Sequence, residues 1–312
     1  MTGVLFILTG WKIFGRMVSD FWVVMLMKKS TVMIIVSMAI FGTIGAFKRY
    51  IGVSAGELAL YRAILAIVFI GLVLLVTKRP IPFRQIRKLL PLLLLSGAAM
   101  GINWILLFLA YERTSVSIAT LSYYFAPIIV TLLCPILFKE KLTLKQILCF
   151  VVSTAGLVLI TGIQTDGNSQ LTGILFGLSA AVFYATVILM NKFIKGVDGL
   201  HRTFLQFVGA VIVLIPYVAL TGGVTLGSLN TSGWVNLLIV GLVHTGLCYC
   251  LYFSALKDLP GQKAAILSYV DPLVAVLISV TVLQEPMSPI QWVGGALILG
   301  ATLVNELHLP KK

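Results

Sequence analysis

GINWILLFLAYERTSVSIATLSYYFAPIIVTLLCPILFKEKLTLKQ (101–146) is the stretch that decides the fold, because its pattern returns 145 residues later. The second copy is GLCYCLYFSALKDLPGQKAAILSYVDPLVAVLISVTVLQEPMSPIQ (246–291), and the two align without gaps. Apolar composition alone would match some Leu and Ala pairs. It would not readily align a Tyr-x-x-Pro frame and then a Glu 13 residues after the Pro. The chain therefore contains an internal repeat. Its identical pairs include Tyr124/Tyr269, Pro127/Pro272 and Glu140/Glu285.

Composition places both copies in a lipid bilayer. Of the 312 residues, 59% are hydrophobic and only 11% are charged, with a mean hydropathy of +1.07. A soluble domain averages about 25% charged residues. An apolar stretch of about 18 residues or more is typical of a membrane span, because only a helix satisfies its own backbone groups in hydrocarbon. The chain is predicted to be an all-α polytopic membrane protein.

Charged and Pro/Gly-rich breaks divide the apolar sequence into ten predicted transmembrane helices. Each half of the repeat holds five of them, and because five is odd the second half enters the membrane in the opposite direction. Two inverted five-helix repeats are a transporter architecture, in which a midplane site opens alternately to either side. The predicted spans are 32–47, 57–77, 90–110, 116–138, 145–162, 171–191, 202–220, 232–256, 261–283 and 289–308.

The net charge of +13 does not indicate nucleic-acid binding, because Lys and Arg lie in short connections between apolar runs. With the N-terminus in the cytoplasm, the cytoplasmic connections hold 17 of these cations and the outer connections hold three, Lys48, Arg49 and Arg113. This bias follows the positive-inside rule. A multi-pass protein of the cell (cytoplasmic) membrane, with both termini cytoplasmic, is predicted.

Residues 1–26 do not fit this pattern. The segment is apolar but interrupted by Lys12, Arg16 and Asp20, and it lacks the basic start and small-residue cleavage site of a signal peptide. Met27 begins an ordinary membrane-protein start. We interpret 1–26 as an upstream extension of doubtful status, lying on the membrane surface if it is translated.

The two Pro-to-Glu units, PIIVTLLCPILFKE (127–140) and PLVAVLISVTVLQE (272–285), together with FGTIGAFKR (41–49) and LALYRAILA (58–66), resemble the EamA family of the drug/metabolite transporter (DMT) superfamily. The resemblance implies two EamA-like repeats, 30–162 and 171–308. It also implies a central cavity formed by the first four helices of each half, with the fifth and tenth helices to the side. Export or facilitated movement of small metabolites, such as amino acids, is the function it implies.

Asp271 is the first candidate site residue. It lies about ten residues into the ninth span, roughly 15 Å deep at 1.5 Å per residue. An ionised Asp at the bilayer centre costs about 2.5–3.5 kcal/mol, so it should face the interior or a water-filled cavity. It could couple transport to protons or bind a substrate amine; alternatively, it makes a structural bond across helices. Pro127 and Pro272 are expected to kink their helices, as hinges or as static bends.

Two further ionisable groups are expected inside the spans. His244 is a plausible partner for Asp271, because histidine titrates near physiological pH, or else a satisfied packing residue. Arg62 could snorkel outward, pair with Glu57, or present a cation to a substrate carboxylate.

The remaining candidates line a predicted aromatic cavity, with core packing as the alternative for any single ring. They pair with one another through the repeat or lie beside such pairs. Glu140 and Glu285 are interpreted as structural groups that bond a neighbouring helix terminus. Ala296 and Gly300 form a small-xxx-small pair that signals close helix packing. The cavity candidates are Asn103, Trp104, Tyr123, Tyr124, Tyr249, Tyr252, Ser268 and Tyr269.

No catalytic motif, metal-ligand motif or P-loop occurs, so neither an enzyme activity, a cofactor nor ATP hydrolysis is predicted. The predicted function is export of small amphipathic metabolites by alternating access, with proton coupling through Asp271 as a hypothesis. A gradient-independent facilitator, a drug efflux protein and an intramembrane enzyme are the alternatives. The sequence leaves the substrate and the formation of a homodimer open.

Overall fold

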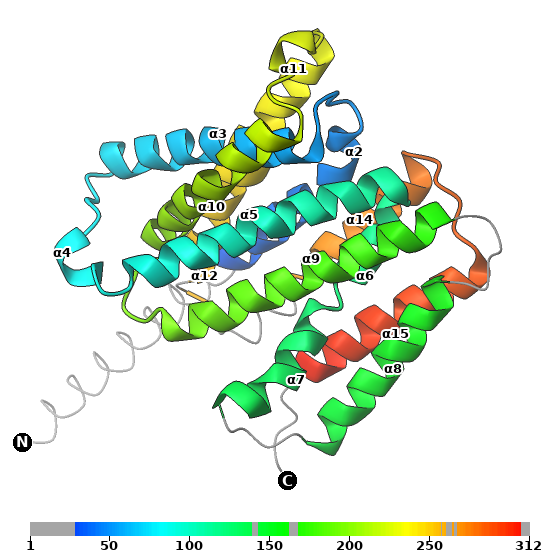
Figure 1. Cartoon of the computed structure of the whole chain (residues 1–312). Helices are drawn as coiled ribbons and strands as arrows, with labels where there is room; N and C mark the ends of the chain where they lie inside the picture. The colour runs from blue at the N-terminus through cyan, green and yellow to red at the C-terminus, as the bar shows by residue number, and fades with distance from the viewer. Residues whose placement is uncertain are drawn as a thin grey trace, which may run out of the picture.

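A computed structural model of the chain describes residues 29–138, 143–161, 168–256, 258–259, 264 and 267–306. Residues 1–26 and Glu140 lie outside these described ranges, so the predictions made for them are not addressed. Within the described ranges the secondary structure is helical, with no β-strand (Figure 1). The prediction of an all-α polytopic membrane protein is confirmed.

Each of the ten predicted spans overlaps an apolar helix of the structure. Within the part of the chain that the structure describes, seven helices are long and apolar enough to cross a membrane, and three apolar helices are shorter. The long ones are Lys29–Lys48 (ending in α2, Ile44–Lys48), α3 (Ala55–Val76), α5 (Leu90–Arg113), Val116–Cys134 (α6, Val116–Tyr123, and part of α7, Ala126–Phe138), Gln170–Phe193 (in α9, Asn168–Phe193), α10 (Gly199–Thr221) and Thr231–Leu256 (α11, Thr231–Leu238; η2, Ile239–Leu247; α12, Cys248–Leu256). The shorter ones lie in α8 (Leu144–Thr161), α14 (Val270–Thr281) and α15 (Pro289–Glu306).

Helix boundaries repeat at the spacing that the sequence repeat predicts. α8 and α15 are related by the same 145-residue shift at both ends, since 144 and 161 become 289 and 306. The fourth span breaks at Tyr124 and Phe125, between α6 and α7, and a turn at Ser268 and Tyr269, within one residue of the equivalent position, precedes α14. The two halves therefore share not only residues but also the position of a break inside a span.

These breaks change the expected role of the two prolines. Pro127 is the second residue of α7 and Pro272 is the third residue of α14. The first turn of a helix has no intrahelical acceptor for its N–H groups, so a proline costs little there. The expectation that each proline kinks a continuous helix was wrong: each one starts a new segment directly after a turn. Movement at these turns stays a prediction.

α5 occupies the middle of the helix array, where it packs along both α9 and α10 (Figure 1). Glycines allow the α5–α10 contact to be close. A Cβ on Gly97 would collide with the backbone of Gln206, and a Cβ on Gly209 with the backbone of Leu94. The Gln206 amide also donates to Ser96 Oγ at 2.8 Å, which ties the same two helices together inside the apolar core.

α8 and α15 pack against each other at one side of the molecule, beside α7 (Figure 1). Their contact is made by Gly156 and Gly294, because a Cβ on either glycine would lie 2.6 Å from the carbonyl oxygen of the other. The predicted small-xxx-small pair does not make this contact. Ala296 is exposed, and a Cβ on Gly300 would meet no atom within 4 Å.

Gly156→Leu is expected to lower the free energy of unfolding by about 1–3 kcal/mol, the usual cost of overpacking a tight contact. Thermal unfolding of the purified protein in detergent measures this loss. Gly300→Leu adds the same side chain to the same helix pair at an open position and should leave the unfolding temperature unchanged. Equal effects of the two variants would contradict the assigned contact.

Candidate functional site

A cavity of about 160 Å³ lies between the helices, and most of the predicted site residues line it. Eight of the eleven predicted binding residues do so. Other lining residues were not predicted, above all Tyr184, Phe41 and Thr120. The eight are Arg62, Trp104, Tyr123, Tyr124, Tyr249, Tyr252, Ser268 and Asp271.

Asp271 joins the two halves at this cavity. It lies in the first turn of α14, and its Oδ2 accepts a hydrogen bond of 2.7 Å from the Tyr124 hydroxyl. Tyr124 belongs to the break in the fourth span, so a residue at one break bonds a residue at the equivalent break. Among the described residues no cation forms an ion pair with Asp271. Its charge is therefore available to the cavity rather than cancelled by a neighbour.

Arg62 supplies the opposite charge. Its side chain is buried, and its guanidinium carbon lies 4.3 Å from the centre of the Trp104 ring and 5.4 Å from that of Phe108. Such cation–π contacts stabilise a buried cation without neutralising it. Arg62 does not pair with Glu57, whose carboxylate instead accepts from the backbone N–H and hydroxyl of Thr225. Of the three roles the sequence left open, the geometry suits the cation facing the cavity.

A π-helical segment positions Arg62 from the other half of the chain. η2 (Ile239–Leu247) carries Thr245, whose Oγ1 accepts from Arg62 Nε at 3.1 Å. π-Helical turns are rare and occur often at functional sites. The segment equivalent by the repeat, 94–102, is regular α-helix within α5. This widened turn is therefore a property of one half only, as Asp271 is.

His244 lies in the same π-helical segment but not in the cavity. Its Nε2 contacts Thr43 Oγ1 at 2.8 Å, and its Nδ1 lies 3.3 Å from the carbonyl oxygen of Ile239. The ring also meets Phe47 edge-on. The expectation that His244 partners Asp271 was wrong, because one ring nitrogen contacts Thr43 in the first span and the other lies beside a carbonyl oxygen of its own segment, η2. His244 ties the first span to η2.

Asn103 and Tyr269 also lie apart from the central cavity. The Asn103 amide donates to the carbonyl oxygen of Ala180 at 2.6 Å, a tie between α5 and α9. Tyr269 lines a second cavity of about 260 Å³ together with Pro127. The two cavities share five lining residues, so they are neighbours separated by these side chains. The shared residues are Tyr123, Tyr124, Tyr184, Tyr252 and Ser268.

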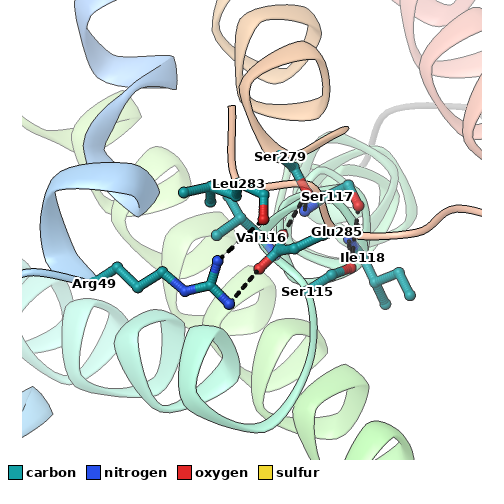
Figure 2. A network of polar contacts seen from close by, with 8 residues as sticks. All are labelled: Arg49, Ser115, Val116, Ser117, Ile118, Ser279, Leu283 and Glu285. Carbon is teal, nitrogen blue, oxygen red and sulfur yellow. Dashed lines mark hydrogen bonds and ion pairs between the residues drawn. The ribbon is translucent and has the colours of Figure 1, made fainter. Parts of the chain in front are cut away.

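A polar network joins the two halves at the face that the sequence predicts to be extracellular, here called the outer face. Figure 2 shows Glu285, which follows α14, reaching the N-terminus of α6. Its Oε2 accepts from Val116 N at 2.8 Å and from the Ser279 hydroxyl at 2.5 Å. Arg49 lies 3.5 Å from its other oxygen. The expectation that Glu285 bonds a neighbouring helix terminus is confirmed.

This network connects elements from the two halves. α6 belongs to the first half and α14 with Glu285 to the second, so the halves cannot separate at this face without breaking these bonds (Figure 2). Tyr111 lines both the central cavity and a surface depression of about 690 Å³ that Glu285 also lines. Tyr111 therefore lies between the central cavity and that depression, beside the Glu285 network.

Glu285→Ala is expected to favour opening of the outer face. Ser115 remains as the N-cap of α6, but the substitution removes the acceptor for Val116 N. Loss of such an acceptor at a helix N-terminus costs about 1 kcal/mol, which corresponds to about a fivefold change in population. A cysteine placed at Tyr111, in a chain with its four native cysteines replaced, should react about fivefold faster with an impermeant maleimide. Thr281→Ala, at the exposed C-terminal end of α14, is the control and should leave the rate unchanged. An unchanged rate in Glu285→Ala would contradict a closing role.

Comparison with known proteins gives a separate family match for each half of the chain. The model of the EamA-like transporter family matches residues 28–162 and again 171–306. An uncharacterized transporter, YxxF, of Bacillus subtilis (strain 168) is 32% identical over 80% of this chain and 81% of its own length. Protein PecM of Dickeya dadantii (strain 3937) is 27% identical over 80% and 82%. A solved crystal structure superposes with a TM-score of 0.63 at 16% identity, over 88% of this chain and 96% of that one, which shows the shared fold.

Proposed function

The chain belongs to the EamA-like transporter family, and from this premise we propose that it exports small amphipathic metabolites carrying both an amine and a carboxylate, such as amino acids. The proposal includes two five-helix repeats, 30–162 and 171–308, that rock about the cavity to expose it alternately to either side. It places the chain in the cell membrane with both termini in the cytoplasm.

One observation carries the proposal: a single cavity is lined by a cation, Arg62, and an acid, Asp271, and neither forms an ion pair with another described residue. Two opposite charges that lie in the same apolar surroundings without pairing with each other form a site for a zwitterion. An interaction with each charge replaces part of the hydration that a zwitterion loses on entering the membrane.

Aromatic side chains supply the rest of the lining. Tyr123 stacks on Tyr184 with ring centres 5.2 Å apart, and Phe41 meets Tyr249 edge-on at the same separation. Such walls favour the apolar part of an amphipathic solute. The central cavity, at about 160 Å³, is smaller than the 300–1,000 Å³ typical of drug sites. Its size supports a small metabolite over a large drug.

Proteoliposomes test the proposal by counterflow. We expect exchange of an apolar amino acid and at least about tenfold slower exchange of its carboxamide and its N-acetyl form, each of which loses one charge. Equal exchange of all three compounds would overturn the proposal that the substrate is a zwitterion. Chemical conversion of the substrate would instead support an intramembrane enzyme.

Proton coupling through Asp271 is the second part of the proposal, and a facilitator that needs no gradient is its nearest rival. The depth of Asp271, its position in the cavity and its bond to Tyr124 support coupling. A facilitator would equilibrate the substrate without accumulation and without a change in internal pH.

A further inference from the structure

A cationic groove lies outside the transport cavity, at the end of α3 that the sequence predicts to be cytoplasmic. Its floor and walls are apolar and come from α3, α10 and the connection that follows α3, and its volume is about 520 Å³. Lys78 and Arg79 are the two charged residues that line it. The apolar lining consists of Gly71, Leu74, Leu75, Pro80, Ile81, Phe83 and Phe204.

The charge of the connection beside this groove is of one sign. Five cations lie within the eleven residues 78–88, and the connection 77–89 contains no Asp or Glu. None of the five forms an ion pair with a described residue. All five are exposed, so they face the lipid headgroups or the water beside them. They are Lys78, Arg79, Arg84, Arg87 and Lys88.

The connection is held in place rather than loosely tethered. α4 (Phe83–Ile86) turns Ile86 inward, where it is buried against Leu93, Ile194, Val197 and Leu205. The neighbouring Phe83 is 54% exposed and lines the groove. Cations and groove are therefore presented in one arrangement.

The repeat shows that the fold itself does not require this charge. Shifting residues 77–89 by 145 gives GGVTLGSLNTSGW (222–234), the connection between α10 and α11, which contains no charged residue. The basic cluster thus belongs to one half only. A topology signal explains an excess of cations on one face, but it does not explain an apolar groove beside them.

We propose that this groove binds an anionic phospholipid, with an acyl chain against the apolar lining and the phosphate beside Lys78 and Arg79. Basic residues next to a span attract anionic lipids by about 1 kcal/mol each. The apolar groove adds a binding site for the acyl chain. Diffuse attraction to a charged surface would not provide such a site. The site is independent of the transported substrate and of the proposed function.

Native mass spectrometry of the purified protein, with phosphatidylglycerol or phosphatidylcholine added, tests this site. We expect one phosphatidylglycerol to be retained per chain and phosphatidylcholine to be lost. The double variant Lys78→Gln/Arg79→Gln should weaken phosphatidylglycerol binding by about tenfold or more, since it removes two of the five cations. The control Lys145→Gln/Lys195→Gln removes two cations elsewhere and should bind as the wild type does.

Gly71→Leu distinguishes the contribution of the apolar groove to lipid binding from that of the cations. It keeps all five cations but places a side chain on the floor, where a Cβ would lie 3.5 Å from the Phe204 ring, an ordinary contact that the fold tolerates. We expect this variant to unfold at the wild-type temperature and to lose the retained lipid. Wild-type binding by Gly71→Leu, or equal retention of phosphatidylcholine, would overturn the proposal.

Discussion

Arg62→Gln is expected to slow exchange of a zwitterionic substrate by about 10- to 100-fold. A hydrogen bond to a charged group contributes about 1.5–3 kcal/mol, and the substrate carboxylate would lose such bonds together with the opposite charge. Of the guanidinium donors, Nε is occupied by Thr245, which leaves the outer nitrogens for the ligand. Initial rates of counterflow in proteoliposomes, normalised to the amount of inserted protein, measure the loss.

Two further variants distinguish the charge of Arg62 from the orientation of its guanidinium group. Arg62→Lys keeps the charge but loses the planar fork, so it should restore only part of the rate. Thr245→Val keeps Arg62 and removes the acceptor that orients it, so a few-fold loss is expected. If Arg62 were only a packing residue against Trp104 and Phe108, lysine and glutamine would behave alike.

The wild-type protein offers a check that does not depend on folding of a variant. Removing the carboxylate from the substrate should lower its exchange by about the same factor as removing the charge from Arg62. Arg62→Gln should in turn treat the amino acid and its carboxamide nearly equally. A variant that still discriminates between them by more than tenfold would exclude Arg62 as the carboxylate partner.

The architecture could be read from the sequence because its signals are local or periodic. Apolar runs predict spans, and the 145-residue shift predicts that α8 and α15 share their bounds. Asp271 could be identified because a charge inside an apolar run is costly and therefore rarely accidental. Glu285 could be interpreted as structural from its place at a span end.

The partners of these groups could not be predicted in the same way. Val116 and Glu285 are separated by 169 residues, and nothing local to either one indicates the other. His244 was assigned to Asp271 because both are ionisable and deep, yet depth does not specify the direction in which a side chain points. Its direction follows from the π-helical turn of η2, and IVGLVHTGL does not differ in pattern from an ordinary apolar helix.

Tyr184 was missed for a related reason. It lies alone in the sixth span, without a repeated partner and without a neighbouring polar residue that would mark a cavity. A mid-span tyrosine has a polar hydroxyl that must find a partner or a cavity, and this was the signal that could have identified it. In the structure its ring stacks on Tyr123 and lines both cavities.

Asp271→Asn is expected to abolish accumulation driven by a pH gradient while leaving exchange measurable. Asparagine has nearly the same size and can still accept from the Tyr124 hydroxyl, so the contact between the two breaks is kept. It cannot take up or release a proton. Accumulation in proteoliposomes with an imposed gradient should fall at least tenfold, whereas counterflow without a gradient should fall less.

Two control variants assign this effect to the cavity. Asp258→Asn removes an acid that accepts from the Ser30 hydroxyl outside the cavity, and it should retain coupled transport. Tyr124→Phe removes the donor to Asp271 but keeps the ring and the acid, so it should shift the pH dependence without abolishing it. Full accumulation by Asp271→Asn, with an unchanged pH dependence, would contradict coupling through this residue and favour the gradient-independent facilitator.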